Sequence, residues 1–99
     1  MKTAFIILKS PQEHDPSRML ERLVDRADGT AILVEDGVYQ AVALPAADRL
    51  REAVAEVLVS SEDLEARGFS SEDLKVGKVV GYPEIVDCIM ERTERTATL

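Results

Sequence analysis

The sequence predicts an α/β fold with helices on both faces of a mainly parallel sheet of about five strands, that is, a three-layer α/β/α sandwich. The first observation behind this prediction is that short apolar runs alternate with segments whose apolar residues recur at helical spacing. The second is that the runs at residues 4–8 and 31–34 are continuously apolar, without the alternation typical of a sheet that has one face in water. Such strands need cover on both sides, and strand–helix–strand units produce parallel sheets.

In the first half of the chain, prolines and capping residues set the boundaries of the expected elements. The first strand ends before Pro11, which cannot donate a backbone hydrogen bond. Asp15 followed by Pro16 predicts the N-cap and first position of a helix, and Pro45 separates two later helices. We expect, in order, a strand at residues 3–8, a helix at 16–27, a strand at 30–34, a short helix at 38–44 and a helix at 46–54.

The second half of the chain is expected to add three strands and two helices. Gly68 is placed to adopt a left-handed conformation at the end of the first of these helices, with Phe69 folding back on it. The last helix opens at Tyr82 and carries Ile85, Val86, Ile89 and Met90 on one side. The elements, in order, are a strand at residues 56–59, a helix at 64–67, a strand at 76–80, a helix from residue 82 and an edge strand at 96–99.

Composition limits the classes of function. The chain has 99 residues, which suits one domain over residues 1–99, and its 12 Lys and Arg against 19 Asp and Glu give a formal net charge of −7. Because the basic residues are scattered, direct binding of nucleic acid through phosphates is not expected. The longest apolar run is far shorter than the roughly 20 residues that cross a bilayer, and no signal-peptide cleavage site follows it. We therefore expect a cytoplasmic protein without a membrane segment.

The acidic turn Glu35-Asp36-Gly37 is the main candidate for a functional surface. It directly follows a buried strand, and open α/β sheets bind ligands and partners at the carboxyl ends of their strands. We expect Asp36 to cap the next helix and Gly37 to begin that helix with a positive φ. Arg67 is expected to hydrogen-bond the last carbonyl groups of its own helix or an acidic partner.

Cys88 is the single cysteine, which excludes an internal disulfide and a CxxC pair. It lies within the last helix, at the margin of the apolar stripe, next to Asp87 and near Glu91. These acids are expected to raise the pKa of its thiol rather than activate it. We therefore predict that Cys88 packs, and a sulfurtransferase that uses Cys88 as its nucleophile is the alternative.

No cofactor or metal site is expected. His14 is the single histidine, and its neighbours Glu13 and Asp15 in a loop before the first helix are too few to favour a metal site over a solvated loop. Motifs typical of nucleotide-binding proteins and of hydrolases do not occur.

Four short segments follow one another at spacings that resemble the TusB/DsrH family of sulfur-relay subunits. They are Leu8-Lys9-Ser10-Pro11, Leu33-Val34-Glu35-Asp36-Gly37-Val38, Asp63-Leu64-Glu65-Ala66-Arg67-Gly68-Phe69 and Tyr82-Pro83-Glu84-Ile85-Val86-Asp87. The resemblance spans nearly the whole chain, and four such segments in this order are specific where one alone is not. It singles out these positions as motif or interface residues: Lys9, Ser10, Pro11, Glu35, Asp36, Gly37, Arg67, Gly68 and Tyr82.

The resemblance implies a DsrE/F-like fold and a place in a complex of three homologous small subunits of the TusBCD or DsrEFH type. Such complexes pass persulfide sulfur toward 2-thiolation of the tRNA wobble uridine or toward sulfur oxidation, and the sulfur-carrying cysteine belongs to the TusD/DsrE-like partner. Some DsrH members also carry a cysteine in the first helix, and the matching position here falls near Leu20. The resemblance therefore implies a non-catalytic subunit, bound to TusC/DsrF-like and TusD/DsrE-like partners.

We also expect the isolated chain to self-associate, as a dimer for example. The reason is that the apolar helix at residues 38–44 is expected to leave an exposed patch that needs cover. A stand-alone homo-oligomer that binds a small ligand at the carboxyl ends of its strands therefore remains a further alternative for function.

Overall fold

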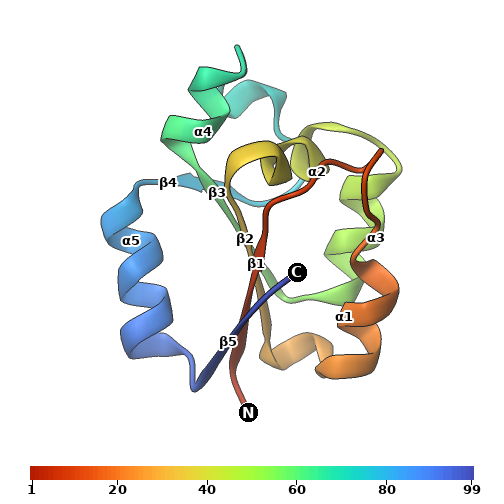
Figure 1. Cartoon of the computed structure of the whole chain (residues 1–99), viewed down its shortest axis with the longest axis vertical. Coiled ribbons are helices and arrows are strands. Elements are labelled where there is room, and N and C mark those ends of the chain that lie inside the picture. The colour runs from red at the N-terminus through yellow and green to blue at the C-terminus, as the bar shows by residue number, and fades with distance from the viewer.

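The computed structural model describes residues 1–99 and contains one sheet of five parallel strands in the order β4-β3-β2-β1-β5 (Figure 1). The strands are β1 (Thr3–Ile7), β2 (Gly29–Leu33), β3 (Glu56–Ser60), β4 (Lys78–Val80) and β5 (Arg95–Thr98). The predicted α/β class and the parallel sheet of five strands are confirmed. β1 pairs with both β2 and β5, so strands from the two ends of the chain lie side by side.

Five helices surround the sheet. They are α1 (Ser17–Leu23), α2 (Tyr39–Val42), α3 (Ala46–Ala53), α4 (Ser61–Ala66) and α5 (Tyr82–Asp87), with 3₁₀ turns at Arg26–Asp28, Glu35–Val38 and Ser71–Asp73 and a π-helical turn at Cys88–Arg92 that continues α5. Figure 1 shows α1 and α3 on one face of the sheet and α5 on the other, while α4 lies beyond the carboxyl ends of the strands. Both faces are covered, as the continuous apolar runs predicted.

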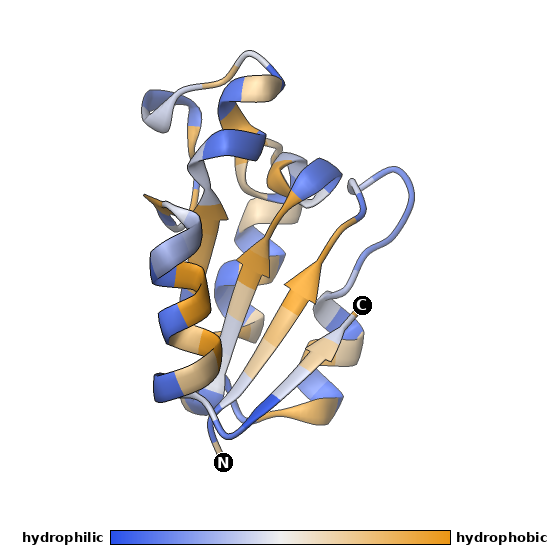
Figure 2. Cartoon of the chain, turned by 60° about the vertical axis from the view of Figure 1, so that its left-hand side comes forward, coloured by the Kyte–Doolittle hydropathy of each residue, from blue (hydrophilic) through white to orange (hydrophobic).

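The core consists of two apolar clusters, one on each face of the sheet. Successive residues of β2 divide between them, because side chains alternate along a strand: Ala31 and Leu33 belong to the cluster under α1, α2 and α3, and Ile32 belongs to the cluster under α5. All five residues of β2 are buried. Figure 2 shows the same distribution, with apolar residues along the central strands and mostly polar residues along β5 at the edge.

The first helix is shorter than the sequence predicted. It ends at Leu23, and the chain then passes through extended Val24 and a 3₁₀ turn into β2, instead of remaining helical to residue 27. Val24 packs against the first core cluster in this extended conformation, which a further helical turn would prevent. At the other end, the helix begins at Ser17 with Pro16 as its N-cap, one residue later than predicted. The carboxylate of Asp15 still accepts hydrogen bonds from the backbone N–H of Ser17 at 3.1 Å and from its Oγ at 2.7 Å.

The expectation that the helix at residues 38–44 exposes an apolar patch is wrong. This segment is a 3₁₀ turn followed by the single turn α2, and its residues Val38 and Ala41 are completely buried in the first core cluster. Leu44 is its only exposed large apolar side chain.

The orientation of the last helix also differs from the prediction. Ile85 and Cys88, three residues apart, face the sheet and belong to the second core cluster, whereas Val86 and Met90 point to solvent. A helix advances about 100° per residue, so Val86 and Met90 lie well away from the side that Ile85 and Cys88 define. Cys88 is therefore central to the buried side and not at its margin.

No helix in the structure has both the length and the apolar character needed to cross a bilayer.

Candidate functional site at the carboxyl edge of the sheet

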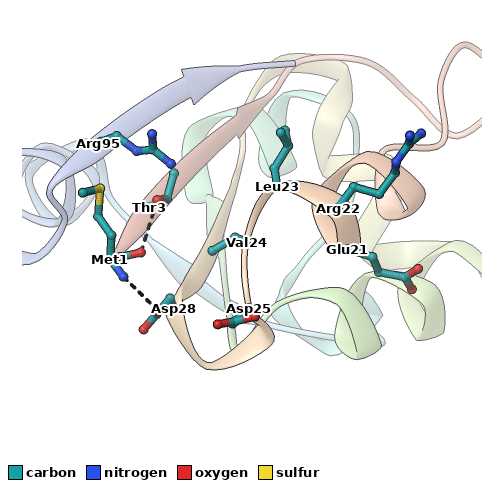
Figure 3. A pocket seen from close by; sticks show the side chains of 9 residues that line it. All are labelled: Met1, Thr3, Glu21, Arg22, Leu23, Val24, Asp25, Asp28 and Arg95. Atoms are coloured by element: carbon teal, nitrogen blue, oxygen red, sulfur yellow. Dashed lines mark hydrogen bonds and ion pairs between the residues drawn. The ribbon is translucent and has the colours of Figure 1, made fainter.

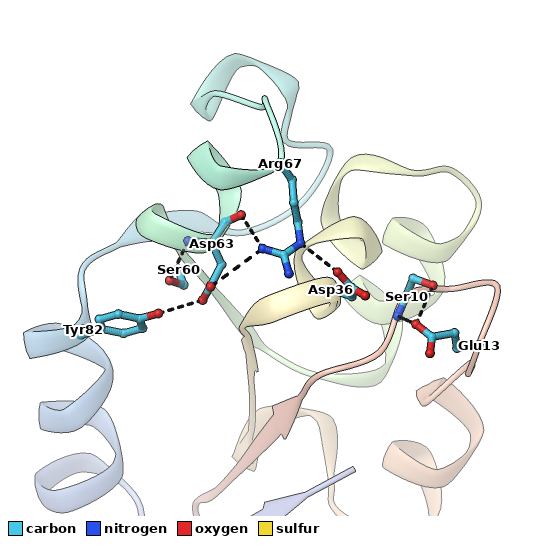
Figure 4. A network of polar contacts seen from close by, with 7 residues as sticks. All are labelled: Ser10, Glu13, Asp36, Ser60, Asp63, Arg67 and Tyr82. Atoms are coloured by element: carbon cyan, nitrogen blue, oxygen red, sulfur yellow. Dashed lines mark hydrogen bonds and ion pairs between the residues drawn. The ribbon is translucent and has the colours of Figure 1, made fainter.

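Four segments that follow parallel strands meet at the carboxyl edge of the sheet. Ser10 comes after β1, Asp36 after β2, and Tyr82 after β4, while Ser60 is the last residue of β3. Arg67, at the end of α4, reaches across to join them (Figure 4). The structure thus brings several of the motif residues together at the edge where the sequence placed the candidate surface.

Arg67 connects α4 to the acidic turn after β2. Its Nε donates to Asp36 Oδ1 at 2.9 Å, and its Nη1 donates to the backbone carbonyl of Asp63 at 3.0 Å. Both kinds of partner named from the sequence, a carbonyl group of its own helix and an acid, are therefore present. The Arg67 side chain is mostly buried between them.

Asp63 is the centre of this network, although the sequence did not single it out. Its Oδ2 accepts a hydrogen bond from the Tyr82 hydroxyl at 3.1 Å, and its backbone N–H donates to Ser60 Oγ at 3.4 Å. Burial by itself would raise the pKa of the Asp63 carboxyl, but the backbone amide of Glu35, the hydroxyls of Ser60 and Tyr82 and the charge of Arg67 together hold this pKa below its ordinary value. The carboxylate is therefore the stable form, and it ties α4 to the start of α5.

The hydrogen bond between Tyr82 and Asp63 also affects the pKa of the Tyr82 phenol. Its hydrogen bond with Ser60 lowers the pKa of its phenol, but the hydrogen bond to Asp63, partial desolvation and the negative charges of Asp63 and Glu62 outweigh this and raise the pKa overall. The phenol therefore stays protonated and acts as a donor to Asp63.

We expect Asp63→Asn to reduce stability at neutral pH by about 1 kcal/mol, because a charge-assisted hydrogen-bond acceptor becomes a neutral one. A carboxyl whose pKa is lowered by folding stabilises the protein above its unfolded pKa, and this contribution is lost as pH falls through the folded pKa. The difference between Asp63→Asn and the parent, measured by urea unfolding, should therefore shrink as pH falls below about 4. Glu65→Gln on the same helix, whose side chain is exposed and unpaired, is the matched control. A difference that is constant with pH would contradict this role.

The acidic turn has a different backbone from the expected one. The residue with positive φ is Glu35, at 49°, and not Gly37, and the 3₁₀ turn is preceded by Val34 without a side-chain cap. The prediction that Asp36 caps this helix is therefore wrong, since its carboxylate binds Arg67 instead. Glycine is needed at position 37 because the backbone there lies against the end of β1: a β-carbon on Gly37 would fall 1.9 Å from the carbonyl oxygen of Ile7.

The loop of Lys9, Ser10 and Pro11 is held both by its own hydrogen bonds and by a buried glutamine. Ser10 donates from its N–H and its Oγ to Glu13 Oε1, at 3.3 and 3.2 Å. Gln40 in α2 is only 2% exposed, and its Nε2 donates to the carbonyls of Lys9 at 3.1 Å and of His14 at 2.9 Å. The signal for Gln40 in the sequence was a single polar residue in the middle of an apolar helix.

Gly68 has the expected left-handed conformation, with φ of 81°. Its N–H donates to the carbonyl of Glu65 at 3.0 Å, and the N–H of Phe69 donates to the carbonyl of Leu64 at 3.1 Å. Phe69 folds back, as predicted, and its ring stands edge-on to Tyr39 with centroids 5.6 Å apart.

None of the five cavities in the structure is lined by Ser10, Asp36, Ser60, Arg67 or Tyr82. One cavity of about 260 Å³ lies at the opposite edge, around Met1, Thr3 and Arg95, where the N-terminal ammonium binds Asp28 at 3.0 Å (Figure 3). No group of three or more His, Cys, Asp or Glu side chains is placed to hold a metal ion. These five motif and network residues at the carboxyl edge therefore border none of the cavities of the structure.

Cys88 lies at the far end of the molecule from this network. It is 1% exposed, and it borders a cavity of about 200 Å³ near Thr30 and Glu56, at the amino ends of β2 and β3. Burial raises the pKa of its thiol; Arg92 opposes this effect, while Glu56 and Asp87 reinforce it. The direction matches the expectation from the sequence, although burial and not the neighbouring acids is the main cause. A buried thiol with a raised pKa is poorly suited to act as a nucleophile.

The model of the family described as "DsrH like protein" matches residues 9–95, which include the four motif segments except Leu8. The chain belongs to the DsrH-like family. This DsrH-like chain is also similar to protein Tm0979 from Thermotoga maritima, known from a solution NMR structure, with 25% sequence identity, 87% of this chain and 90% of that chain covered, and a TM-score of 0.61. No curated protein matches it. DsrH-like proteins are sulfur-relay subunits and are generally part of a complex with DsrE/F-like subunits.

The first helix, α1, contains no cysteine that could carry sulfur. Leu20, near which the resemblance places a cysteine in some members of the family, is completely buried in the first core cluster of this DsrH-like chain.

Proposed function

We propose that this DsrH-like chain, as a single domain over residues 1–99, is a non-catalytic subunit of a cytoplasmic sulfur-relay complex. Its partners are a TusC/DsrF-like and a TusD/DsrE-like subunit. The complex passes persulfide sulfur toward 2-thiolation of the tRNA wobble uridine or toward sulfur oxidation. In this role the chain contacts the other subunits and touches neither nucleic acid nor membrane, and it needs no cofactor.

The observation that carries this proposal is the position of the only thiol. A sulfur carrier must present a thiolate to a donor and then to an acceptor, but Cys88 is 1% exposed and burial raises its pKa. The burial of this thiol favours a subunit that supports transfer between cysteines of other chains.

The network at the carboxyl edge supports a docking role. Asp36 and Tyr82 each expose about half of their side chain, yet hydrogen bonds to Arg67 and Asp63 fix both in position. Polar groups that are held rigidly before binding lose little conformational entropy when a partner docks. We propose that Lys9, Ser10, Pro11, Glu35, Asp36, Arg67 and Tyr82 contribute to the surface that contacts a homologous subunit.

We expect Cys88→Ser to leave sulfur transfer by the assembled complex nearly unchanged. The substitution places a hydroxyl on a packed side of α5, so a modest loss of stability is expected, while the path of the sulfur is untouched. Transfer of labelled persulfide sulfur through a complex reconstituted with the DsrE- and DsrF-like subunits measures this.

Two controls make the result decisive. Replacing the carrier cysteine of the DsrE-like subunit by serine should abolish transfer, and co-purification should show that the complex containing Cys88→Ser still assembles. If transfer disappears while assembly persists, Cys88 carries sulfur and the chain is a sulfurtransferase. If the chain binds neither homologous subunit, the relay role itself is wrong.

A further inference from the structure

Two helices on opposite faces of the sheet carry apolar side chains that the fold leaves uncovered. In α1, Met19 and Leu23 are about half exposed. Val86 in α5 is more than half exposed, and Met90, in the turn that continues α5, is the most exposed large apolar side chain of the chain at 72%. The members of each pair are four residues apart, so each pair lies on one side of its helix.

On α1 the apolar pair is flanked by arginines. Arg18 and Arg22 are exposed, are also four residues apart, and form no ion pair within the chain. These two arginines thus place positive charge beside the exposed methionine and leucine side chains, in a chain whose net charge is −7. We call Arg18, Met19, Arg22 and Leu23 the α1 face.

Acidic residues flank the apolar pair on α5. Asp87 and Glu91 are exposed and four residues apart; Glu91 forms no ion pair, and Asp87 is only 4.0 Å from Arg92, which itself lies closer to Glu56 at 3.5 Å. We call Val86, Asp87, Met90 and Glu91 the α5 face.

The two faces are complementary in charge and in order. On the α1 face each charged residue precedes its apolar neighbour, whereas on the α5 face each charged residue follows it. A helix turns about 100° per residue, so the charged row lies on one side of the apolar row in α1 and on the other side in α5. When two such helices pack apolar row against apolar row and run in the same direction, both charged rows lie on the same side and meet.

The α1 face also has room for an inserted side chain. A hollow of about 530 Å³, the largest in the structure, is bordered by residues of this face together with His14 and Asp15. Met90 projects from the α5 face and is long and flexible, as suits a side chain that fills an irregular hollow.

We propose that the α1 face of one copy of this chain binds the α5 face of a second copy. Since α1 and α5 lie on opposite faces of the sheet (Figure 1), two copies cannot satisfy both contacts around one two-fold axis. The contact is therefore head-to-tail, and repeated addition leads to a closed ring or an open chain. It needs no other subunit and is thus independent of the relay role proposed above.

The test uses two variants that each lose one face. Arg18→Glu with Arg22→Glu reverses the α1 face, and Asp87→Lys with Glu91→Lys reverses the α5 face. The parent should show a mass that rises with concentration beyond the monomer in light scattering or sedimentation, and each variant alone should associate at least about tenfold more weakly. An equimolar mixture of the two variants should regain the association that each variant has lost. The unchanged α5 face of the first variant fits the unchanged α1 face of the second, and the two reversed faces also carry opposite charges.

Glu65→Lys with Glu72→Lys is the matched control, since it makes the same change in charge as the α5 reversal at exposed, unpaired positions away from both faces. It should associate like the parent, and circular dichroism should show that all variants are folded. A parent that stays monomeric would overturn the proposal. So would a variant that associates like the parent, or a mixture of the two variants that does not regain association.

Discussion

Gly37→Ala is expected to cost about 3 kcal/mol or more of unfolding free energy, one of the largest effects of a single substitution in this chain. The added β-carbon would lie 1.9 Å from the carbonyl oxygen of Ile7 and 2.7 Å from its carbonyl carbon. Backbone atoms cannot swing aside as a side chain can, so the turn after β2 would have to move away from the end of β1. This movement breaks the hydrogen bond from the Val34 N–H to the Ile7 carbonyl, which is 3.2 Å long. Urea unfolding monitored by circular dichroism measures the loss.

Two other glycines give graded controls for this substitution. Gly68→Ala adds a methyl group with nothing within 4 Å, so it should cost only the roughly 1 kcal/mol of a left-handed backbone. At Gly81 the new β-carbon makes an ordinary contact at 3.5 Å and φ is negative, so Gly81→Ala should be close to the parent. If Gly37→Ala were no more damaging than Gly68→Ala, the close approach to Ile7 would be wrong.

Gln40→Leu is expected to cost about 2–3 kcal/mol, although leucine has a similar size and greater hydrophobicity. The substitution removes two hydrogen bonds and leaves the carbonyls of Lys9 and His14 without their donor. These carbonyls belong to the loop between β1 and α1, so the loop should also become more mobile. Hydrogen exchange of its amides, together with urea unfolding, measures both effects.

Ser10→Ala is the control that distinguishes the effect of the buried Gln40 on this loop from the effect of the loop's exposed hydrogen bonds. It removes only the exposed hydrogen bond to Glu13 and should change stability by less than about 0.5 kcal/mol. Under the docking proposal, Gln40→Leu should weaken binding to a homologous subunit, because it releases the segment that presents Lys9 and Ser10. If Gln40→Leu matched the parent in stability and exchange, the loop would not depend on Gln40.

The strands were predictable because apolar runs report burial directly. β2 is buried along its whole length, so its sequence carries a signal that needs no knowledge of its neighbours. The left-handed conformation of Gly68 was equally predictable, since a helix end followed by glycine is a local pattern. The helix ends were less predictable: Val24 leaves α1 to pack on the core, and this competition between helix and packing is not encoded locally.

The candidate site was predictable in place but not in detail. Topology alone brings the ends of parallel strands to one edge, so the position of Asp36 followed from the sequence. Its partner did not, because the contact with Arg67 joins residues 31 positions apart, and that of Tyr82 with Asp63 joins residues 19 apart. At Gly37 the local rule misled, since glycine is favoured both by positive φ and by lack of space, and only the tertiary fold distinguishes the two.

The pairing of β1 with β5 has a consequence for the chain during its synthesis on the ribosome. β1 is made before the other four strands of the sheet, but the neighbour on one of its sides is β5, at Arg95–Thr98. At typical rates of synthesis the intervening chain takes on the order of ten seconds to appear. During that time the side of residues 3–6 that later pairs with β5 is open, and some of the most apolar side chains of the molecule lie on the same strand. The nascent chain is therefore vulnerable to pairing with another strand along β1, and this exposure ends when β5 emerges and pairs with it.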